Sequence, residues 1–573
     1  MTSPPRPLRT APLSLPAPLE DALERLTSVG QPLEIRTEPV NGVMMKMFAN
    51  RPRHLAALLD TAAAHGDREC LVDARGRQTY REVVTAIRQG AAGLRDHLGV
   101  SPGSRVALLA ANRSDWVIAM WAILYAGATV VALNGWWTED EIGHALQASQ
   151  CTLLIGDRKR LERIHAIDGI QHITLDSPAK PSEIAFTSLL SSEALEYPVA
   201  VEEHDIAAIM FTSGTTGQPN GALISHRAWI AGLMNSMTAI MAETLANPRL
   251  SDADQDVRVL ASLPFFHVGG GHGVAIAALA SGATIVIPPE KFEPATTLAL
   301  FESERISRWS AVPAMVQAVC THPGRTRHDL SALRTLGYGA APSGSALQDL
   351  AHQVFPGLQA ISNAYGLTET GSVMAMNTGE DLRTRPDSVG RPFPTAEIRI
   401  TDDDDTPLAQ GTPGNIQIRG PFLMTGYLEG QEDDLFAPDR WLRTGDVGYV
   451  DTDGFIYLVD RKKDVIIRGG ENIFAGEVER RLELHPAITE AAVVAAPSER
   501  LGEEVRAIIH LESGRTLSAD EVRDWTAQSL AQFKIPSIVE FSDHPLPRNA
   551  AGKLLKRDLR GISYPAHSPA ERS

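Results

Sequence analysis

A run of hydroxyl and glycine side chains at residues 211–221 is the stretch of this chain best suited to chemistry. Six successive residues carry only a hydroxyl or no side chain: Thr212, Ser213, Gly214, Thr215, Thr216 and Gly217. Glycine lets a backbone approach a ligand closely, and consecutive N–H groups with nearby hydroxyls form an anion site. The spacing is not that of a Walker loop, and such clusters also occur in surface loops. We interpret the run as a phosphate-binding loop, with a surface loop as the alternative.

A second candidate site is the sequence Tyr365-Gly366-Leu367-Thr368-Glu369. Tyrosine offers a flat face for a base, and Gly366 allows the backbone to approach a nucleotide closely. A threonine hydroxyl can donate to phosphate, and a glutamate is a hard oxygen ligand for the Mg²⁺ that accompanies ATP. A Thr-Glu pair taken alone is more often the start of a helix.

These two motifs resemble those of the adenylate-forming superfamily, which includes acyl-CoA synthetases and aryl-CoA ligases. The likeness covers about residues 52–560, and further motifs follow in the family's order. Members activate a carboxylate with ATP as an acyl-adenylate and then pass the acyl group to an acceptor, most often a thiol. One departure concerns Asn220, because the family usually has lysine at that position.

The resemblance also implies which residues hold ATP. A Gly-Tyr-Gly-Ala-Ala-Pro turn at residues 337–342 would pack on adenine, and Asp446 would accept the ribose hydroxyls. The expected nucleotide contacts are Thr212, Ser213, Gly214, Thr215, Thr216, Gly217, Gly339, Ala340, Ala341, Asn363, Ala364, Tyr365, Gly366, Asp446, Arg461, Lys463 and Gly470.

The catalytic residues implied by the resemblance are Lys553, Glu369, His267 and Thr368, with Glu369 and Thr216 as the metal ligands. Lys553 would place an ammonium group against the charge that develops on phosphorus during adenylation. His267 would line the acyl site. A metal site at His267 and His272 is not favoured, because their spacing fits no usual zinc motif and no third ligand is near.

Alternating strand and helix patterns predict an α/β fold with a largely parallel sheet. Capping boxes at Thr79 and Thr138 each begin a helix, a helix is expected over residues 114–125, and a strand over 129–133. The resemblance implies a large adenylation domain of mixed α/β sheets at residues 51–460 and a hinge at 461–464. A small α+β domain would follow at 465–560, with an N-terminal extension at 1–50, partly disordered, and a tail at 561–573.

The bulk composition limits the partners of the protein. A net charge of -17 argues against nonspecific nucleic-acid binding. The three cysteines are far apart and form no CxxC pair, which fits a reducing compartment such as the cytoplasm. No secretory signal is recognised. The uncharged run at residues 116–137 could span a bilayer by length, but glycine and asparagine interrupt it, so we expect buried core rather than an integral membrane segment.

We therefore expect an ATP-, Mg²⁺- and coenzyme A-dependent ligase that acts on a fatty or aromatic carboxylic acid. Transfer of the acyl group to a carrier protein or an amine, and a diverged non-catalytic binding protein, remain alternatives. No basic residue stands out among the acyl-site candidates, which include Trp309, Val312, Tyr338 and Met374, so the acid is expected to be apolar beyond its carboxylate. A homodimer is possible.

Overall fold

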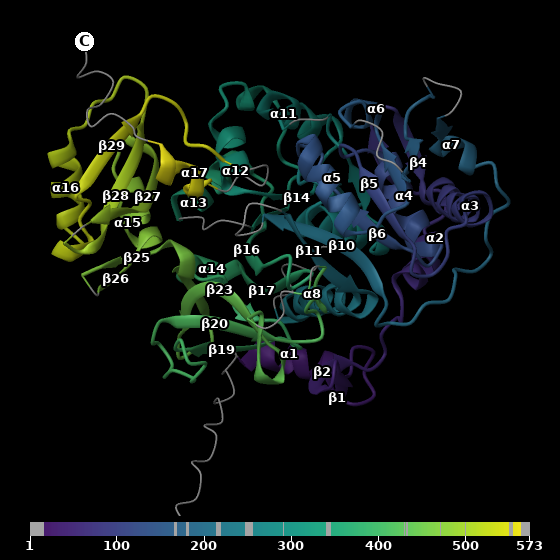
Figure 1. Ribbon diagram of the computed structural model, residues 1–573, viewed down its shortest axis with the longest axis horizontal. Coiled ribbons are helices and arrows are strands. Elements are labelled where there is room, and N and C mark those ends of the chain that lie inside the picture. The colour runs from purple at the N-terminus through teal and green to yellow at the C-terminus, as the bar shows by residue number, and fades with distance from the viewer. Residues whose placement is uncertain are drawn as a thin grey trace, which may run out of the picture.

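The computed structural model describes residues 17–164, 169–178, 183–213, 219–246, 256–289, 292–339, 345–428, 430, 434–469, 471–498, 500–548 and 554–562. Two large sheets and two smaller ones carry most of the chain, with helices packed against them (Figure 1). A separate hairpin pairs β1 (Ile35–Val40) with β2 (Val43–Phe48). This arrangement confirms the predicted α/β class.

The first large sheet has eight strands. Its order is β21 (Gly426–Tyr427), β11 (Pro219–Ser225), β10 (Ile206–Ser213), β6 (Thr129–Ala132), β5 (Arg105–Leu109), β7 (Leu153–Gly156), β8 (Gln171–Thr174) and β9 (Ile184–Ala185). The strands from β10 to β9 are parallel, whereas β11 runs antiparallel to β10. The sheet is therefore mixed, because β10 returns through a hairpin and not through a helix.

The second large sheet has nine strands. Its order is β18 (Arg391–Pro392), β17 (Val373–Thr378), β16 (Ala360–Gly366), β15 (Thr335–Gly339), β14 (Arg308–Ala311), β12 (Arg258–Leu260), β13 (Thr284–Val286), β3 (Glu69–Asp73) and β4 (Gly76–Thr79). Its interior strands are parallel and both of its edges are antiparallel.

Two five-stranded sheets follow along the chain. One contains β19 (Glu397–Thr401), β20 (Gly414–Arg419), β22 (Phe436–Ala437), β23 (Trp441–Val450) and β24 (Ile456–Arg461). The other contains β25 (Val465–Arg468), β26 (Glu471–Phe474), β27 (Ile488–Ser498), β28 (Gly502–Leu511) and β29 (Ile538–Ser542). The predicted hinge thus lies between strands of different sheets, and the domain boundaries stay a prediction.

Helices connect and cover these sheets. They are α1 (Ala17–Thr27), α2 (Leu58–Ala63), α3 (Tyr80–Leu98), α4 (Ser114–Tyr125), α5 (Glu139–Ala148), α6 (Arg158–Leu161), α7 (Phe186–Leu189), α8 (His226–Ala246), α9 (Val268–Gly270), α10 (Ala277–Ala280), α11 (Pro294–Ser303), α12 (Pro313–Thr321), α13 (Ser345–Val354), α14 (Gly379–Thr384), α15 (Ala475–Glu483), α16 (Ala519–Ala527) and α17 (Lys556–Gly561). Both capping boxes are confirmed, at Thr79 with Glu82 and at Thr138 with Glu141.

Residues 116–133 of the uncharged run are buried, whereas Trp136 near its end is 46% exposed. The run divides into α4, whose Trp116 and Trp121 are buried, and the fully buried strand β6. The indole N–H of Trp121 donates to the carbonyl oxygen of Ala275 at 3.0 Å. Among the described residues, no helix is long and apolar enough to cross a bilayer.

Candidate active site

The phosphate-loop motif stands at the carboxyl edge of the eight-stranded sheet. β10 ends at Ser213 and β11 begins at Pro219, so the loop closes a hairpin in which Thr212 faces Asn220 across the two strands. Loop residues Gly214, Thr215, Thr216 and Gly217 lie outside the described residues, so their contacts with ATP remain predictions. Parallel α/β sheets bind ligands at this edge, which suits the motif.

The Tyr-Gly-x-Thr-Glu motif forms the turn between β16 and β17. The Thr370 hydroxyl accepts from the Leu367 N–H at 2.8 Å and lies 2.7 Å from the Ser372 carbonyl oxygen, which ties the turn together. Gly366 is required here, because a Cβ atom would lie 2.4 Å from the Ser372 carbonyl oxygen. The turn presents Thr368 and Glu369, both half-buried.

Glu369 is linked to the hairpin that carries the phosphate loop through Tyr427, a residue that the sequence analysis missed. The Tyr427 hydroxyl donates to Oε1 of Glu369 at 2.6 Å, and the backbone of Tyr427 in β21 pairs with Ala222 of β11. Burial, and next the charge of Glu369, raises the pKa of Tyr427, so the hydroxyl keeps its proton. The only local signal was a Gly-Tyr pair in a short strand, which has no chemical signature of its own.

Asp446, the predicted ribose-binding residue, is buried, with 5% of its surface exposed. Its carboxylate accepts from the Tyr365 hydroxyl at 2.6 Å on Oδ2, and Nε of Arg461 lies 2.6 Å from Oδ1. Asp446 and Arg461 are cross-strand partners in β23 and β24. Burial, and next the charge of Asp446, raises the pKa of Tyr365. A carboxylate held in this way can also accept hydroxyl groups of a sugar.

Three further residues of the predicted nucleotide site lie at the carboxyl edge of the nine-stranded sheet. Gly339 of β15 pairs with Ala364 of β16, next to the buried Asn363, whose amide donates to the Ser388 carbonyl oxygen at 3.3 Å. Ala340 and Ala341 lie outside the described residues. The structure therefore places Gly339 beside Ala364, as expected if both contact the same adenine. Their contact with adenine stays a prediction.

His267 is the residue before the short helix α9 and makes no side-chain capping hydrogen bond, and α9 continues into a π-helical turn, Gly271–Ile276. Its ring packs on Phe266, with the two centroids 4.7 Å apart. Burial lowers the pKa of His267 to about 4, so the imidazole is neutral near pH 7. His272 is buried, and its Nε2–H donates to the Trp229 carbonyl oxygen at 2.8 Å. No group of three metal-ligating side chains occurs in the described part of the chain.

The predicted hinge residue Lys463 is exposed in a short 3-10 turn, Lys462–Asp464. The Arg560 guanidinium donates to the Lys463 carbonyl oxygen and pairs with Asp464, both at 3.0 Å. Gly470 and Lys553 lie outside the described residues, so their roles remain predictions.

All four acyl-site candidates named from the sequence are buried in the hydrophobic core, with Val312 4% and Met374 0% exposed. Trp309 and Tyr338 are 1% and 2% exposed, in a cluster with Phe301 and Phe355. The Trp309 ring packs edge-on against Phe301 with the centroids 5.2 Å apart. We assign both residues to core packing.

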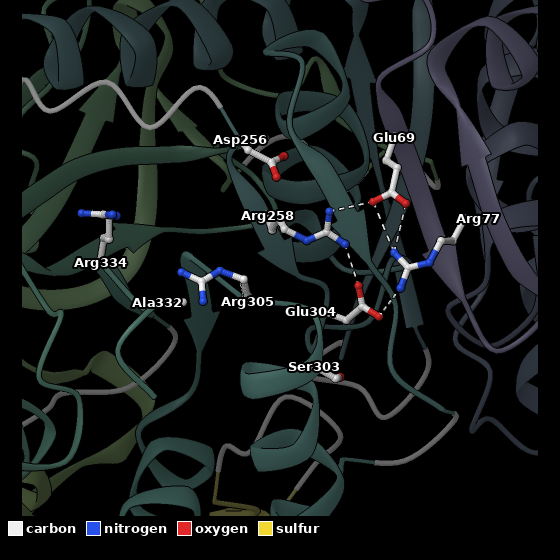
Figure 2. A pocket seen from close by; sticks show the side chains of 9 residues that line it. All are labelled: Glu69, Arg77, Asp256, Arg258, Ser303, Glu304, Arg305, Ala332 and Arg334. Carbon is white, nitrogen blue, oxygen red and sulfur yellow. Dashed lines mark hydrogen bonds and ion pairs between the residues drawn. The ribbon is translucent and has the colours of Figure 1, made fainter. Parts of the chain in front are cut away.

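A charged pocket of about 270 Å³ lies at the opposite edge of the nine-stranded sheet (Figure 2). Arg258, the first residue of β12, pairs with Glu69 at 2.7 Å and Glu304 at 2.6 Å, and Arg77 closes the ring at 3.1 and 2.6 Å. The ring of alternating charges joins the amino-terminal ends of strands, away from Gly339 and Gly366. We interpret it as an ion-pair network with a structural role.

Two families of known proteins match separate parts of the chain. Residues 58–428 match the AMP-binding enzyme family, and residues 477–553 match the AMP-binding enzyme C-terminal domain. A 3-[(3aS,4S,7aS)-7a-methyl-1,5-dioxo-octahydro-1H-inden-4-yl]propanoyl:CoA ligase of Mycobacterium tuberculosis is 35% identical over 87% of this chain and 96% of its own. The 4-coumarate–CoA ligase 3 of Oryza sativa is 33% identical over 86% and 89%.

Solved structures show the same likeness. The amide bond synthetase McbA from Marinactinospora thermotolerans has a TM-score of 0.77 at 27% identity, covering 88% of this chain and 99% of its own. The o-succinylbenzoate CoA synthetase from Bacillus subtilis, in complex with its acyl-adenylate, has a TM-score of 0.75 at 28% identity, covering 90% and 99%.

Proposed function

The chain belongs to the AMP-binding enzyme family. From this premise we propose which of its residues act in each step of an acid–thiol ligase reaction. In the first step an acid carboxylate attacks the α-phosphorus of ATP, which forms acyl-AMP and releases pyrophosphate. In the second step the thiol of coenzyme A attacks the acyl carbon, loses its proton and releases AMP. The observation that carries the assignment is the hydrogen bond to Glu369 from Tyr427, which lies beside the hairpin that carries the phosphate loop.

Each cluster of the site has a separate task in this proposal. Asp446, oriented by Tyr365 and Arg461, binds the ribose hydroxyls. Thr212 and Thr368 donate to phosphate. Glu369 is suited to Mg²⁺, because carboxylate oxygens are the ligands this ion prefers. When bound, the ion neutralises charge on the phosphates. Lys553 remains the proposed cation for adenylation.

We further propose an acid in which an apolar ring carries a three-carbon carboxylic side chain. This class is common to the two CoA ligases compared by sequence, since 4-coumarate is an aryl-propenoate and the mycobacterial ligase is named for a bicyclic propanoyl group. The three cysteines are buried free thiols, which supports our proposal of a cytoplasmic location. A homodimer remains a prediction.

The test is pyrophosphate release with Mg-ATP across matched acids that differ in ring and chain length, each with and without coenzyme A. We expect release with aryl-propenoates or bicyclic propanoates, many turnovers only when coenzyme A is present, and weak release with benzoates or straight-chain acids. Preference for long aliphatic acids would contradict the proposed class. Release that requires no acid, or no release with any acid, would contradict the enzyme assignment.

A second candidate is transfer of the acyl group to an amine. The likeness to an amide bond synthetase motivates it. The same assay therefore needs an arm in which primary amines replace coenzyme A. Amide formed with many turnovers, while coenzyme A leaves pyrophosphate release at about one turnover, would favour this acceptor.

A further inference from the structure

The two ends of the Lys553 segment, residues 549–553, are fixed next to each other. Arg548 precedes the segment and Leu554 follows it, and these two residues form an antiparallel bridge. The Leu555 N–H also donates to the Pro547 carbonyl oxygen at 2.9 Å. The segment therefore begins and ends at adjacent points of the structure, and Lys553 directly precedes the second point.

Glu490 of β27 binds the first end. Its Oε2 accepts from the Leu546 N–H at 2.6 Å, and its Oε1 accepts from Nη2 and Nε of Arg548 at 3.0 and 3.2 Å. The Glu490 side chain is 18% exposed. Hydrogen bonds to ionised groups are shorter and stronger than those between neutral groups. One carboxylate thus fixes both the backbone and a side chain just before the Lys553 segment.

Glu479 of α15 binds the second end. Lys556, the first residue of α17, places its Nζ 2.8 Å from Oε1 and 2.9 Å from Oε2 of Glu479. The Val493 N–H of β27 donates to the same carboxylate at 2.7 Å. Burial opposes the charge of Lys556, but Glu479 raises its pKa, so the ammonium group stays protonated at neutral pH. The elements α15, β27 and α17 are therefore joined at this carboxylate.

An apolar cluster anchors the same region independently of the ion pairs. Leu546 and Leu559 pack with Ala492, Val494 and Ile508. Burial of these side chains stabilises the attachment of both flanks to the sheet. Loss of one ion pair should therefore shift an end of the Lys553 segment without unfolding it.

Position is critical for a lysine that acts on phosphorus. An ammonium group stabilises developing charge only where that charge forms, and a misplacement of about 1 Å can cost about a hundredfold in rate. Lysine has a flexible four-carbon side chain, so its placement depends on how its backbone is held. Here the backbone on each side of Lys553 is held by an acidic residue.

We propose that Glu479 and Glu490 are positioning residues for acyl-AMP formation. They hold the two ends of the Lys553 segment, so that Lys553 meets the α-phosphate in one orientation, and they act through Lys553 and not on the substrate. The proposal rests on the proposed function, in which Lys553 is the cation for adenylation. Thioester formation from acyl-AMP should not depend on these carboxylates.

The test measures single-turnover acyl-AMP formation and, separately, thioester formation from preformed acyl-AMP. Glu490→Gln and Glu479→Gln should each slow acyl-AMP formation about tenfold or more and leave thioester formation within about twofold. Lys556→Arg keeps a cation against Glu479 and should retain most of the rate, whereas Lys556→Gln should match Glu479→Gln. Unfolding in urea checks that every variant is folded.

Two further variants separate positioning from a purely structural effect. Lys553→Ala/Glu490→Gln should be no slower in acyl-AMP formation than Lys553→Ala alone, because a residue that acts through Lys553 has no effect once Lys553 is gone. Glu477→Gln is the matched control, since Glu477 lies on the same helix and pairs with Lys534 at 2.6 Å with 31% of its side chain exposed. It should change neither half-reaction.

The outcomes distinguish this proposal from the proposed function. If Lys553→Ala stops acyl-AMP formation while Glu490→Gln and Glu479→Gln leave it unchanged, positioning is wrong and the proposed function stands. Equal slowing of both half-reactions, or additive losses in the double variant, would also overturn positioning. If Lys553→Ala forms acyl-AMP at the wild-type rate, the role of Lys553 fails and positioning fails with it.

Discussion

The carboxylate of Asp446 is held by groups from two separate segments of the chain. Tyr365 comes from β16 and Arg461 from β24, and each contacts a different carboxylate oxygen at 2.6 Å. Hydrogen bonds to ionised groups are stronger than those between neutral groups, so this triad keeps a buried negative charge in one orientation. A ribose would then meet an acceptor that is already positioned.

Tyr365→Phe should weaken ATP binding and lower stability. The change removes one donor to a buried carboxylate, which costs about 1.5–3 kcal/mol for a charged partner. We expect a higher KM for ATP in pyrophosphate release and a smaller free energy of unfolding in urea. Tyr457→Phe, which removes a hydroxyl 3.3 Å from Asp451 in the same sheet, should change neither by as much. An unaltered KM for ATP would contradict the role of the triad.

Asn220→Lys should lower the KM for ATP. Asn220 faces Thr212 across the hairpin that carries the phosphate loop, so a lysine there would reach toward phosphate. A charge-assisted hydrogen bond contributes about 1.5–3 kcal/mol, which corresponds to at least about tenfold. Asn220→Met, which adds length without charge, is the control. An unchanged or higher KM in Asn220→Lys would refute the hypothesis.

At the scale of elements, α8 supports the turn between β16 and β17 through a close contact. Gly232 lies against Ser372 of the turn, and a Cβ atom there would be 2.2 Å from Oγ and 2.5 Å from Cβ of Ser372. The turn also carries Glu369, which Tyr427 holds from the neighbouring strand β21. The position of Glu369, the proposed metal ligand, therefore depends on how tightly α8 packs against the turn.

Gly232→Ala should impair pyrophosphate release by displacing this turn. Overpacking of this kind typically costs about 1–3 kcal/mol. The double variant Gly232→Ala/Ser372→Gly removes the opposing side chain and should recover most of the activity. Gly143→Ala on α5, where a Cβ atom meets nothing within 4 Å, should be tolerated. A double variant as slow as Gly232→Ala would show that the contact with Ser372 is not the cause.

At the scale of the whole molecule, the predicted hinge contacts both the β19–β20 connection before it and helix α17 after it. Lys462 pairs with Asp403 of the β19–β20 connection at 2.7 Å, and Arg560 of α17 holds the following Lys463 and Asp464. Exposed pairs contribute little to overall stability. A pair that exists in only one orientation of the small domain can nevertheless shift the balance between orientations.

Lys462→Ala should therefore change the two half-reactions unequally, by up to about fivefold, while global stability stays nearly constant. The measurement is single-turnover acyl-AMP formation set against thioester formation from preformed acyl-AMP. Asp403→Asn should reproduce the effect. Arg515→Ala breaks an exposed pair with Glu512 away from the hinge and serves as control. Equal changes in both half-reactions would contradict a role in domain orientation.

Short-range sequence patterns were sufficient to predict many helices and strands of the fold. The expected helix at residues 114–125 is α4, Ser114–Tyr125, and both capping boxes are present, because a cap depends on residues three positions apart. The expected strand at 129–133 is β6, Thr129–Ala132. The strand that leads into the phosphate-loop motif, β10, extends to Ser213, because β11 pairs with it and adds backbone hydrogen bonds.

By itself the sequence determined the motifs, the family and the chemical types of the residues proposed to bind the nucleotide. Only the tertiary structure decided that Tyr427 holds Glu369, 58 residues away, and that Tyr365 holds Asp446, 81 residues away. It also decided that Trp309 and Tyr338 pack in the core while Trp136 stands exposed. The physical reason is that motifs and caps depend on neighbouring residues, whereas burial and side-chain pairing depend on which strands become adjacent.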